Sequence, residues 1–444
     1  MRRLAPVLLA PVMTLAFDAA AFAAAGGGSS GFGGGRGGGG GFSGGGGGFS
    51  GGGGRATGGG GLIVVLLIVL AVLVLFAVGA VGRQRARKRR AVRAHEVEQA
   101  SAVAADDDEA FAADTVRAAA AELYAEVQAA WTDRDLERLG TLASPDLLLE
   151  WRRRLDDFDR KGWHNRVQLR SEPIVEYVGL VNRSDDADDR VVVRIECVLR
   201  DYVATASGQR MMREGAQSDT VTSSEYWTLY KRDGAWRLAS IEQDAEGAHQ
   251  LERPIVATPW DDTQRLREDA VAERAGEDAA PAGFAPAELV DLDFDGTARA
   301  AALDLALADG RFDPDLIEAS VRRVVEAWAQ AVDGDDDALE AAARPAAVAE
   351  LLHAGDPSRR TRLVVRGPRV SALQIVALDA GADPATIAVE LQVAGRRYVE
   401  DRDTAAVLSG SRDRQDEWTE RWTLALDGDG EWPWRIAATR VPAR

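Results

Sequence analysis

Apolar and polar residues recur along this chain with two periods, a helical one followed by a β one, and that order occurs twice. Between residues 116 and 131 apolar side chains recur at steps of three or four, which predicts a helix with one buried face. These side chains are Val116, Ala120, Leu123, Val127 and Trp131.

A second long helix is marked at both of its ends. Ser144 can act as its N-cap and Pro145 suits its first turn. Gly162 stands just beyond its last turn, where glycine often ends a helix. The sequence therefore predicts a helix over about residues 145–161.

From residue 191 the period changes to two, which predicts strands with one buried face. Every second residue is apolar: Val191, Val193, Ile195, Cys197 and Leu199. Residues 221–232 alternate as well, and Asp233-Gly234 then suits a tight turn into a further strand. Helices followed by an antiparallel sheet predict an α+β domain over residues 106–250.

The second half repeats this order. Asp313-Pro314 begins a helix with a buried face, and residues 386–393 alternate like a strand. We expect residues 251–291, which are rich in acidic residues and proline, to be a linker. Residues 292–444 are then expected to form a second, more divergent domain.

The spacing of tryptophans supports an internal duplication. Trp227 follows Trp131 by 96 positions, and Trp422 follows Trp328 by 94. Each later tryptophan opens a Trp-Thr-Leu stretch that leads into a Trp-Arg-(Leu or Ile)-Ala stretch. Burial of one indole is worth up to about 5 kcal/mol, which is enough to explain these residues as pins of a hairpin.

The first 105 residues have the features of a signal peptide followed by a membrane anchor. Residues 1–25 have the basic start, apolar run and small residues of a signal peptide. Residues 26–61 contain 25 glycines and predict a disordered linker. Leu62–Val81 is a run of 20 residues without a charge, which predicts a transmembrane helix over residues 62–82.

A basic juxtamembrane segment, residues 83–105, follows the predicted helix. By the positive-inside rule its side of the membrane is the cytoplasm, so we expect a single-pass protein of a bacterial plasma membrane with a cytoplasmic C-terminal part. The residues expected to contact lipid headgroups, either as a general anchor or as a specific anionic-lipid site, are Arg83, Arg85, Arg87, Lys88, Arg89, Arg90 and Arg93.

Composition narrows the classes of partner. The net charge is −18, and the acidic excess lies beyond residue 95, which argues against a nucleic acid as the partner. One cysteine, Cys197, and four scattered histidines provide no pair with metal-ligand spacing. We therefore expect neither a metal nor a cofactor.

Several of these motifs together resemble the Tim44-like family, named for a subunit of the mitochondrial inner-membrane translocase. They are the Ser-Pro-Asp-Leu helix start, Gly162 with Asn165, and the closing Glu-Tyr-Trp-Thr-Leu hairpin. The resemblance covers residues 109–245 well and 312–440 more weakly. It implies two tandem cone-shaped domains of the nuclear transport factor 2-like fold, each with helices on a curved antiparallel sheet and an apolar pocket. It also implies a scaffold that touches anionic lipid.

Six residues are the candidates for lining such pockets. Glu225 and Glu420 occupy matched positions, and by strand parity each shares a face with the tryptophan two residues later. Tyr202 and Tyr398 precede Trp227 and Trp422 by 25 and 24 positions. A carboxylate beside an indole can have a raised pKa and act as a base, or it can simply cap a strand or pair with an arginine.

The leading hypothesis is a membrane-anchored, non-catalytic binding or scaffold protein with a role in protein or lipid transport. Its expected partners are the bilayer and, beyond it, either other membrane or translocated proteins or an anionic lipid. The protein segment or lipid is expected to be held in a cone-shaped pocket. The alternative is a hydrolase or isomerase that uses Glu225 as a general base. A third hypothesis is that one copy is degenerate and only pairs with the other.

Overall fold

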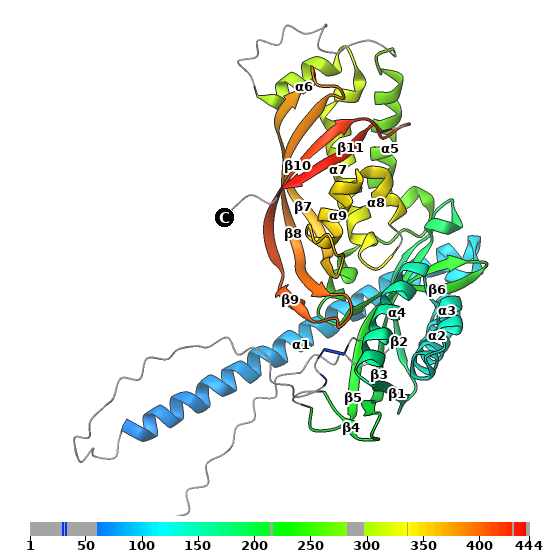
Figure 1. The fold of residues 1–444 in the computed structure, drawn as a ribbon, viewed down its shortest axis with the longest axis vertical. Helices are drawn as coiled ribbons and strands as arrows, with labels where there is room; N and C mark the ends of the chain where they lie inside the picture. The colour runs from blue at the N-terminus through cyan, green and yellow to red at the C-terminus, as the bar shows by residue number, and fades with distance from the viewer. Residues whose placement is uncertain are drawn as a thin grey trace, which may run out of the picture.

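The computed structural model describes residues 29–30, 32, 60–213, 216–281, 297–334, 336–428 and 430–440. The predicted signal peptide, residues 1–25, lies outside the described residues. Among the described residues there are two large hydrophobic cores, one built from residues 32–257 and one from residues 272–436, and a small third cluster of Val178, Val192 and Tyr226. We refer to the parts around the two large cores as the N-terminal unit and the C-terminal unit. Both units mix helices with a curled antiparallel sheet (Figure 1).

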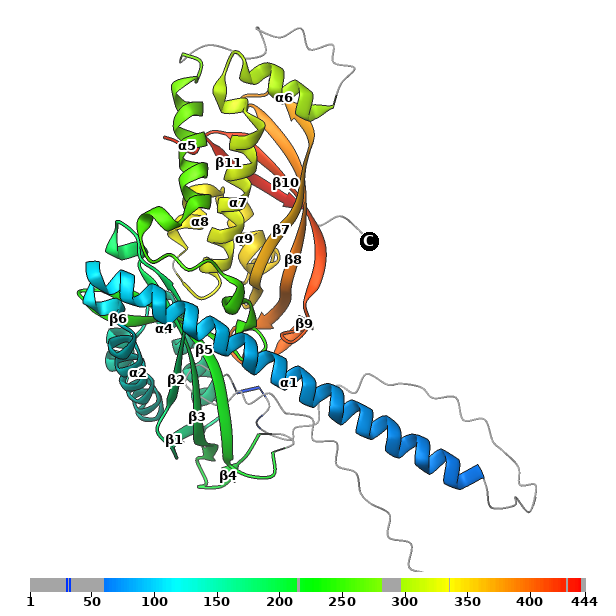
Figure 2. The same cartoon turned by 180° about the vertical axis from the view of Figure 1, so that it is seen from behind.

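The chain enters the N-terminal unit through one long helix, α1, which spans Gly60–Asp107. It contains both the predicted membrane span and the predicted basic segment, and its first half extends away from both sheets (Figures 1 and 2). Among the described residues, no helix combines the length and the apolar character needed to cross a bilayer. Most side chains of residues 60–80 lie outside that set, and the predicted span is not confirmed.

The second half of α1 belongs to the folded body. Val97 and Ala104 are buried in the N-terminal core. The packed structure therefore begins inside the segment predicted as basic and juxtamembrane, and not at residue 106.

The helices of the N-terminal unit follow the predicted periodicity. Their bounds are η1 Glu109–Phe111, α2 Ala113–Asp133, α3 Leu136–Leu142 and α4 Pro145–Arg160. Ser144 is the N-cap of α4, and its hydroxyl accepts a hydrogen bond from the Leu147 amide at 3.3 Å. Gly162 has a φ of +65°, which explains the glycine just past the end of this helix. The predictions for these helices are confirmed.

The first sheet is antiparallel throughout, with the order β1-β3-β5-β6, and β2 and β4 also pair with β3. The bounds are β1 Trp163–Leu169, β2 Ile174–Val181, β3 Arg190–Thr205, β4 Arg210–Met211, β5 Thr220–Arg232 and β6 Ala235–Gln243. Asp233 and Gly234 have φ values of 52° and 72° between β5 and β6. That pair forms the predicted hairpin turn, because two positive φ values match the twist of the flanking strands.

The segment predicted as a linker is largely structured. It contains part of η3 Gly247–Glu252, then η4 Pro259–Asp261 and the helix α5 Thr263–Glu277. Ala272 and Ala275 of α5 are buried in the C-terminal core. The expected linker therefore contains a packed helix, because Pro254 and Pro259 precede α5, Pro281 and Pro286 follow it, and none of the four interrupts it. Residues 282–291 of the segment lie outside the described residues.

The C-terminal unit again places helices before a sheet. Its helices are α6 Ala298–Ala306, η6 Gly310–Phe312, α7 Pro314–Ala331, α8 Asp337–Ala342 and α9 Pro345–His353. Its strands are β7 Thr361–Asp379, β8 Thr386–Asp401, β9 Val407–Gly410, β10 Asp416–Leu426 and β11 Trp434–Arg440. The order is β7-β8-β10-β11, and β9 pairs with β8.

Both units close their last strand in the same way. In the N-terminal unit, Trp236 packs edge-on against Phe111 at 5.3 Å and its indole N–H donates to the Ala110 carbonyl. In the C-terminal unit, Trp434 packs against Phe312 at 5.5 Å and its indole N–H donates to the Arg311 carbonyl. Both tryptophans therefore fasten the final strand to a short 3-10 helix that directly precedes a long helix, η1 before α2 and η6 before α7.

Candidate functional site

Glu225 is the best-defined candidate of the N-terminal unit. It lies on β5 and is 2% exposed. Its carboxylate accepts hydrogen bonds from the indole Nε1 of Trp227 at 2.9 Å and from the hydroxyl of Ser223 at 3.1 Å. Burial raises the pKa of Glu225 to about 7, although these hydrogen bonds lower it. The carboxyl group is thus held by donors from its own strand.

The surroundings of Glu225 are packed. Trp227 is fully buried, and the ring of Tyr124 from α2 lies 5.0 Å from it. Beside them, the Trp131 indole donates to Asn165 at 2.8 Å, and the Asn165 amide donates to Asp201 at 2.7 Å. This chain of buried polar side chains joins α2 to β1 and β3.

Tyr202 and Tyr398 occupy different environments despite their matched spacing. Tyr202 is partly exposed, and its ring lies beneath the guanidinium groups of Arg200 and Arg210 at 5.4 and 4.9 Å. Tyr398 is buried on β8 and donates its hydroxyl hydrogen to Glu246 of the N-terminal unit at 2.5 Å. Tyr398 therefore contributes to the contact between the units.

Glu420 lines a small cavity in the C-terminal unit. The cavity holds about 130 Å³, and its wall also includes Trp328, Glu350, Leu351, Ala354, Leu363, Arg397 and Thr439. Arg397 forms an ion pair with Glu420 at 3.2 Å, and the Trp418 indole donates to the same carboxylate at 3.0 Å. Burial raises the pKa of Glu420, and the Arg397 charge opposes that shift. Trp422 is fully buried, and its ring packs edge-on against that of Trp328 at 6.3 Å.

The chemistry available at these positions is limited. This cavity is smaller than the roughly 300–1,000 Å³ of ordinary ligand pockets, and its carboxylate is already paired with an arginine. Within the described ranges, no three His, Cys, Asp or Glu side chains are placed to hold a metal ion. Cys197 is buried in the N-terminal core, where burial raises the pKa of its thiol and makes it a poor nucleophile.

The structure describes the side chains of six of the seven basic residues predicted to contact headgroups, and four of the six, including Arg89, are exposed. Arg85, Arg87 and Lys88 are exposed on α1. The side chain of Arg83 lies outside the described set. The other three bind the protein: Arg89 pairs with Glu252, Arg90 with Glu176, and Arg93 donates to the Val178 and Arg253 carbonyls.

Arg93 differs most clearly from the prediction that these residues contact lipid headgroups. It is 8% exposed, and its two hydrogen bonds to backbone carbonyls measure 2.8 and 2.7 Å. Loss of hydration on burial lowers the pKa of its guanidinium. Its side chain holds α1 against β2 and is not directed toward a lipid surface.

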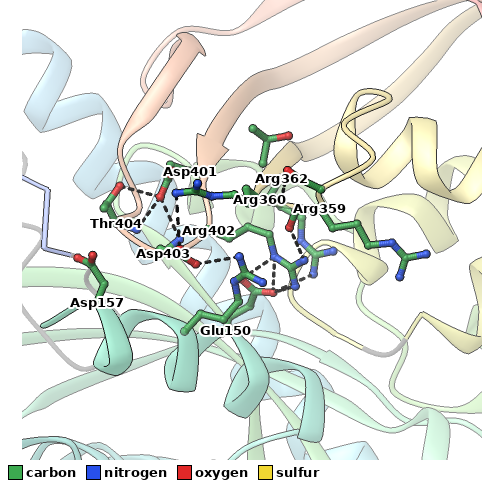
Figure 3. Close-up of polar contacts among 12 residues, drawn as sticks. Glu150, Asp157, Arg359, Arg360, Arg362, Asp401, Arg402, Asp403 and Thr404 are labelled. Carbon is green, nitrogen blue, oxygen red and sulfur yellow. Dashed lines mark hydrogen bonds and ion pairs between the residues drawn. The ribbon is translucent and has the colours of Figure 1, made fainter. Parts of the chain in front are cut away.

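Sequence reasoning missed a cluster of buried charges between the two units (Figure 3). Glu150 of α4 accepts from Arg402 of the C-terminal unit at 2.9 and 3.1 Å, and Arg362 lies 3.8 Å away. Burial raises the pKa of Glu150, but the Arg402 hydrogen bond and nearby guanidinium charges hold it below its usual range. Arg154 pairs with Glu400 at 3.3 Å beside it. No local pattern reveals these partners, because they stand about 250 positions apart.

The end of α1, the helices α2 to α4 and the sheet that ends in the β5–β6 hairpin share one hydrophobic core. Residues 97–243 match the Tim44-like domain. This Tim44-like domain begins inside α1 and ends at the last residue of β6. The match covers the residues on which the sequence resemblance depends and does not extend over the C-terminal unit.

Two solved structures are also similar to the chain. The first is the intermembrane space region of the chloroplast protein ARC6, with 13% identity and a TM-score of 0.23, covering 29% of this chain and 95% of that one. The second is an NTF2-like protein involved in plasmid conjugation, with 12% identity and a TM-score of 0.16, covering 70% of this chain and 87% of that one. At these TM-scores the likeness says nothing about what the chain binds. No curated protein matches the chain.

Proposed function

We propose that this chain is a non-catalytic binding or scaffold protein at the cytoplasmic face of a bacterial plasma membrane, with a role in protein or lipid transport. The Tim44-like domain over residues 97–243 supports a binding role. The observation on which the proposal depends is the burial and hydrogen bonding of the Glu225 carboxyl group. This carboxyl group, the best candidate for a catalytic base, is 2% exposed and accepts hydrogen bonds from two residues of its own strand.

Attachment to the membrane is the part of the proposal that rests on sequence. Leu62–Val81 contains no charge, and the exposed cations Arg85, Arg87 and Lys88 follow it on α1. A cationic flank of this kind favours the cytoplasmic side and attracts anionic lipid. The C-terminal unit is proposed to be a second copy of the same fold, supported by the shared strand order and the two equivalent tryptophan anchors.

One observation favours a rival function. The pKa of Glu225 is raised to about 7, which suits a general base near neutral pH. The rival, a hydrolase or isomerase, requires that a substrate reach this carboxyl group.

Replacement of Glu225 separates the two functions. Glu225→Gln keeps the shape and the hydrogen-bond acceptor but removes the base. We expect the purified variant to retain the proteins and lipids that co-purify with the wild-type chain, and any trace turnover of ester or isomerase substrates to be unchanged. Turnover by the wild-type chain that disappears in Glu225→Gln would establish the rival.

A further inference from the structure

Part of the glycine-rich segment is packed into the N-terminal unit. Ser29 is 2% exposed and Phe32 is 5% exposed, and Phe32 belongs to the same core as the tryptophans of the Tim44-like domain. Composition predicts a disordered linker over residues 26–61, so ordered residues within it are a departure from that expectation. Burial of a phenylalanine offsets the loss of chain entropy that glycine imposes.

The contacts of the two serines are specific. The Ser29 hydroxyl donates to the Asp157 carboxylate near the end of α4, and Lys161 donates to both of these groups at 2.6 Å. Asp157 is itself buried. The Ser30 amide donates to the Thr404 carbonyl of the C-terminal unit at 3.0 Å. Figure 3 shows Asp157 and Thr404 on the two sides of this contact.

Phe32 is held by an aromatic ring and a cation. Its ring lies 6.5 Å from that of Phe158 in an edge-on arrangement, and the Arg213 guanidinium stacks over it at 4.4 Å. Phe32 and Arg213 also form an antiparallel β-bridge. Arg213 is fixed in turn by its 3.1 Å ion pair with Asp201, and it donates to the Ser30 carbonyl at 3.3 Å.

The sequence around Phe32 differs from the other Gly-Phe pairs of the segment. Gly-Phe occurs at residues 31–32, 41–42 and 48–49, but only Phe32 is preceded by Ser-Ser-Gly. Phe42 and Phe49 are preceded by glycines alone. The hydroxyl contact of Ser29 therefore distinguishes the first pair from the other two.

We infer that Asp157, Phe158, Lys161, Arg213 and Thr404 form a binding site for a Ser-Ser-Gly-Phe turn, and that Ser29, Ser30 and Phe32 of the same chain fill it; the Phe32 amide donates to the Ser29 carbonyl at 3.2 Å. We name this set the SSGF site. It combines a buried carboxylate and a lysine for a small hydroxyl, a backbone acceptor, and an aromatic–cation pair for one phenylalanine. The inference does not depend on the proposed membrane attachment.

The SSGF site has a consequence for topology. Residues 29–32 can reach it within one molecule only when they lie on the same side of a bilayer as the Tim44-like domain. A single crossing at residues 62–82 would place them on the opposite side. In a chain inserted that way, the SSGF site is free for a peptide of the same chemistry from another polypeptide.

Photo-crosslinking of the full chain in detergent micelles tests the site. Phe32 is replaced by p-benzoyl-phenylalanine, and Phe42 receives the same replacement as the matched control. We expect the probe at position 32 to crosslink within one molecule to peptides that contain Phe158 or Arg213, and the probe at position 42 not to. Equal crosslinking from both positions, crosslinks only between copies, or none at all would overturn the inference.

The same probe in sealed membrane vesicles separates this inference from the proposed attachment. If residues 62–82 cross the bilayer, the intramolecular crosslink is lost in vesicles but kept in micelles. A crosslink that persists in vesicles supports the SSGF site and contradicts the single crossing.

Peptide binding gives a second readout on the full chain. A labelled GGGSSGFGGG peptide is expected to bind the Phe32→Ala variant roughly tenfold more tightly than the wild type, because the internal competitor is removed. Phe42→Ala is the control and is expected to bind like the wild type. A GGGGGGFGGG peptide, which lacks the two serines, should bind the Phe32→Ala variant more weakly than the GGGSSGFGGG peptide does. Equal affinity of the wild type and Phe32→Ala would contradict an internal occupant.

Discussion

Two buried carboxyl groups of the N-terminal unit have opposite pKa shifts because their hydrogen-bond donors differ. Glu225 is held by the neutral donors Trp227 and Ser223, and burial raises its pKa to about 7. Glu150 is held by the Arg402 guanidinium, and its pKa stays below the usual range although it too is buried. Burial alone therefore does not decide the charge of a carboxyl group in this protein.

The raised pKa of Glu225 makes stability depend on pH. The folded state binds this proton more tightly than the unfolded state, so the contribution is fully present below about pH 4.5 and is lost as the pH rises through about 7. Ionisation costs about 3 kcal/mol across that window. We expect Glu225→Gln to flatten the fall in the free energy of unfolding between pH 5 and 7, measured by denaturant titration. An unchanged slope would show that Glu225 is not the group responsible.

The sequence predicted which of these side chains are buried better than it predicted which residues they contact. Strand parity placed Glu225 on one face with Trp227, and both are buried. Parity could not reveal that Tyr398 donates to Glu246, or that Arg93 donates to Val178, because those partners come from distant parts of the chain. The pocket-lining role of the six candidates stays a prediction.

The hairpins and helix ends are the elements that local sequence determines most strongly. Asp108 and Asp309 each accept a hydrogen bond from the amide two residues later and so begin the 3-10 helices that receive Trp236 and Trp434. The turn at Asp233-Gly234 fixes the register of β5 and β6. These features follow from a few adjacent residues, and for that reason the turn could be predicted.

Two glycines with equally open surroundings test the role of backbone conformation. A Cβ at Gly234 or at Gly276 would meet no atom within 4 Å, but only Gly234 has a positive φ, of 72°. We expect Gly234→Ala to destabilise the fold by about 1–2 kcal/mol. Gly276→Ala, within α5, should stabilise it by about 0.4–1 kcal/mol. Thermal denaturation of both variants is the measurement, and shifts of the same sign would contradict this explanation.

Other elements could not be predicted because tertiary contacts decide them. Arg194 alternates with the apolar residues predicted to form the buried face of this strand, so it lies on the other face of β3, yet it is 4% exposed and pairs with Asp244 at 2.7 Å. The helix α1 covers this side of the sheet, where Arg90 and Arg194 both pair with Glu176. Periodicity reports which face of a strand is apolar, but not that a helix from outside the expected domain covers the other face.

At the scale of the whole molecule, buried charges hold the two units together. The Glu150–Arg402 pair is extended by Arg153 with Asp403 at 2.8 Å and by Arg366 with Glu242 at 3.7 Å. Removal of one partner from such a buried pair is costly because the other charge stays buried. This arrangement favours a fixed relation between the units.

The binding role is tested most directly by capture of partners. The tagged full chain is crosslinked in membranes of the producing bacterium and purified, and the bound proteins and lipids are identified by mass spectrometry against an untagged control. The account predicts that the same protein or lipid is enriched in every replicate, with the wild-type chain and with Glu225→Gln alike. A chain that is recovered without partners, and that turns over a substrate only when Glu225 is present, would contradict it.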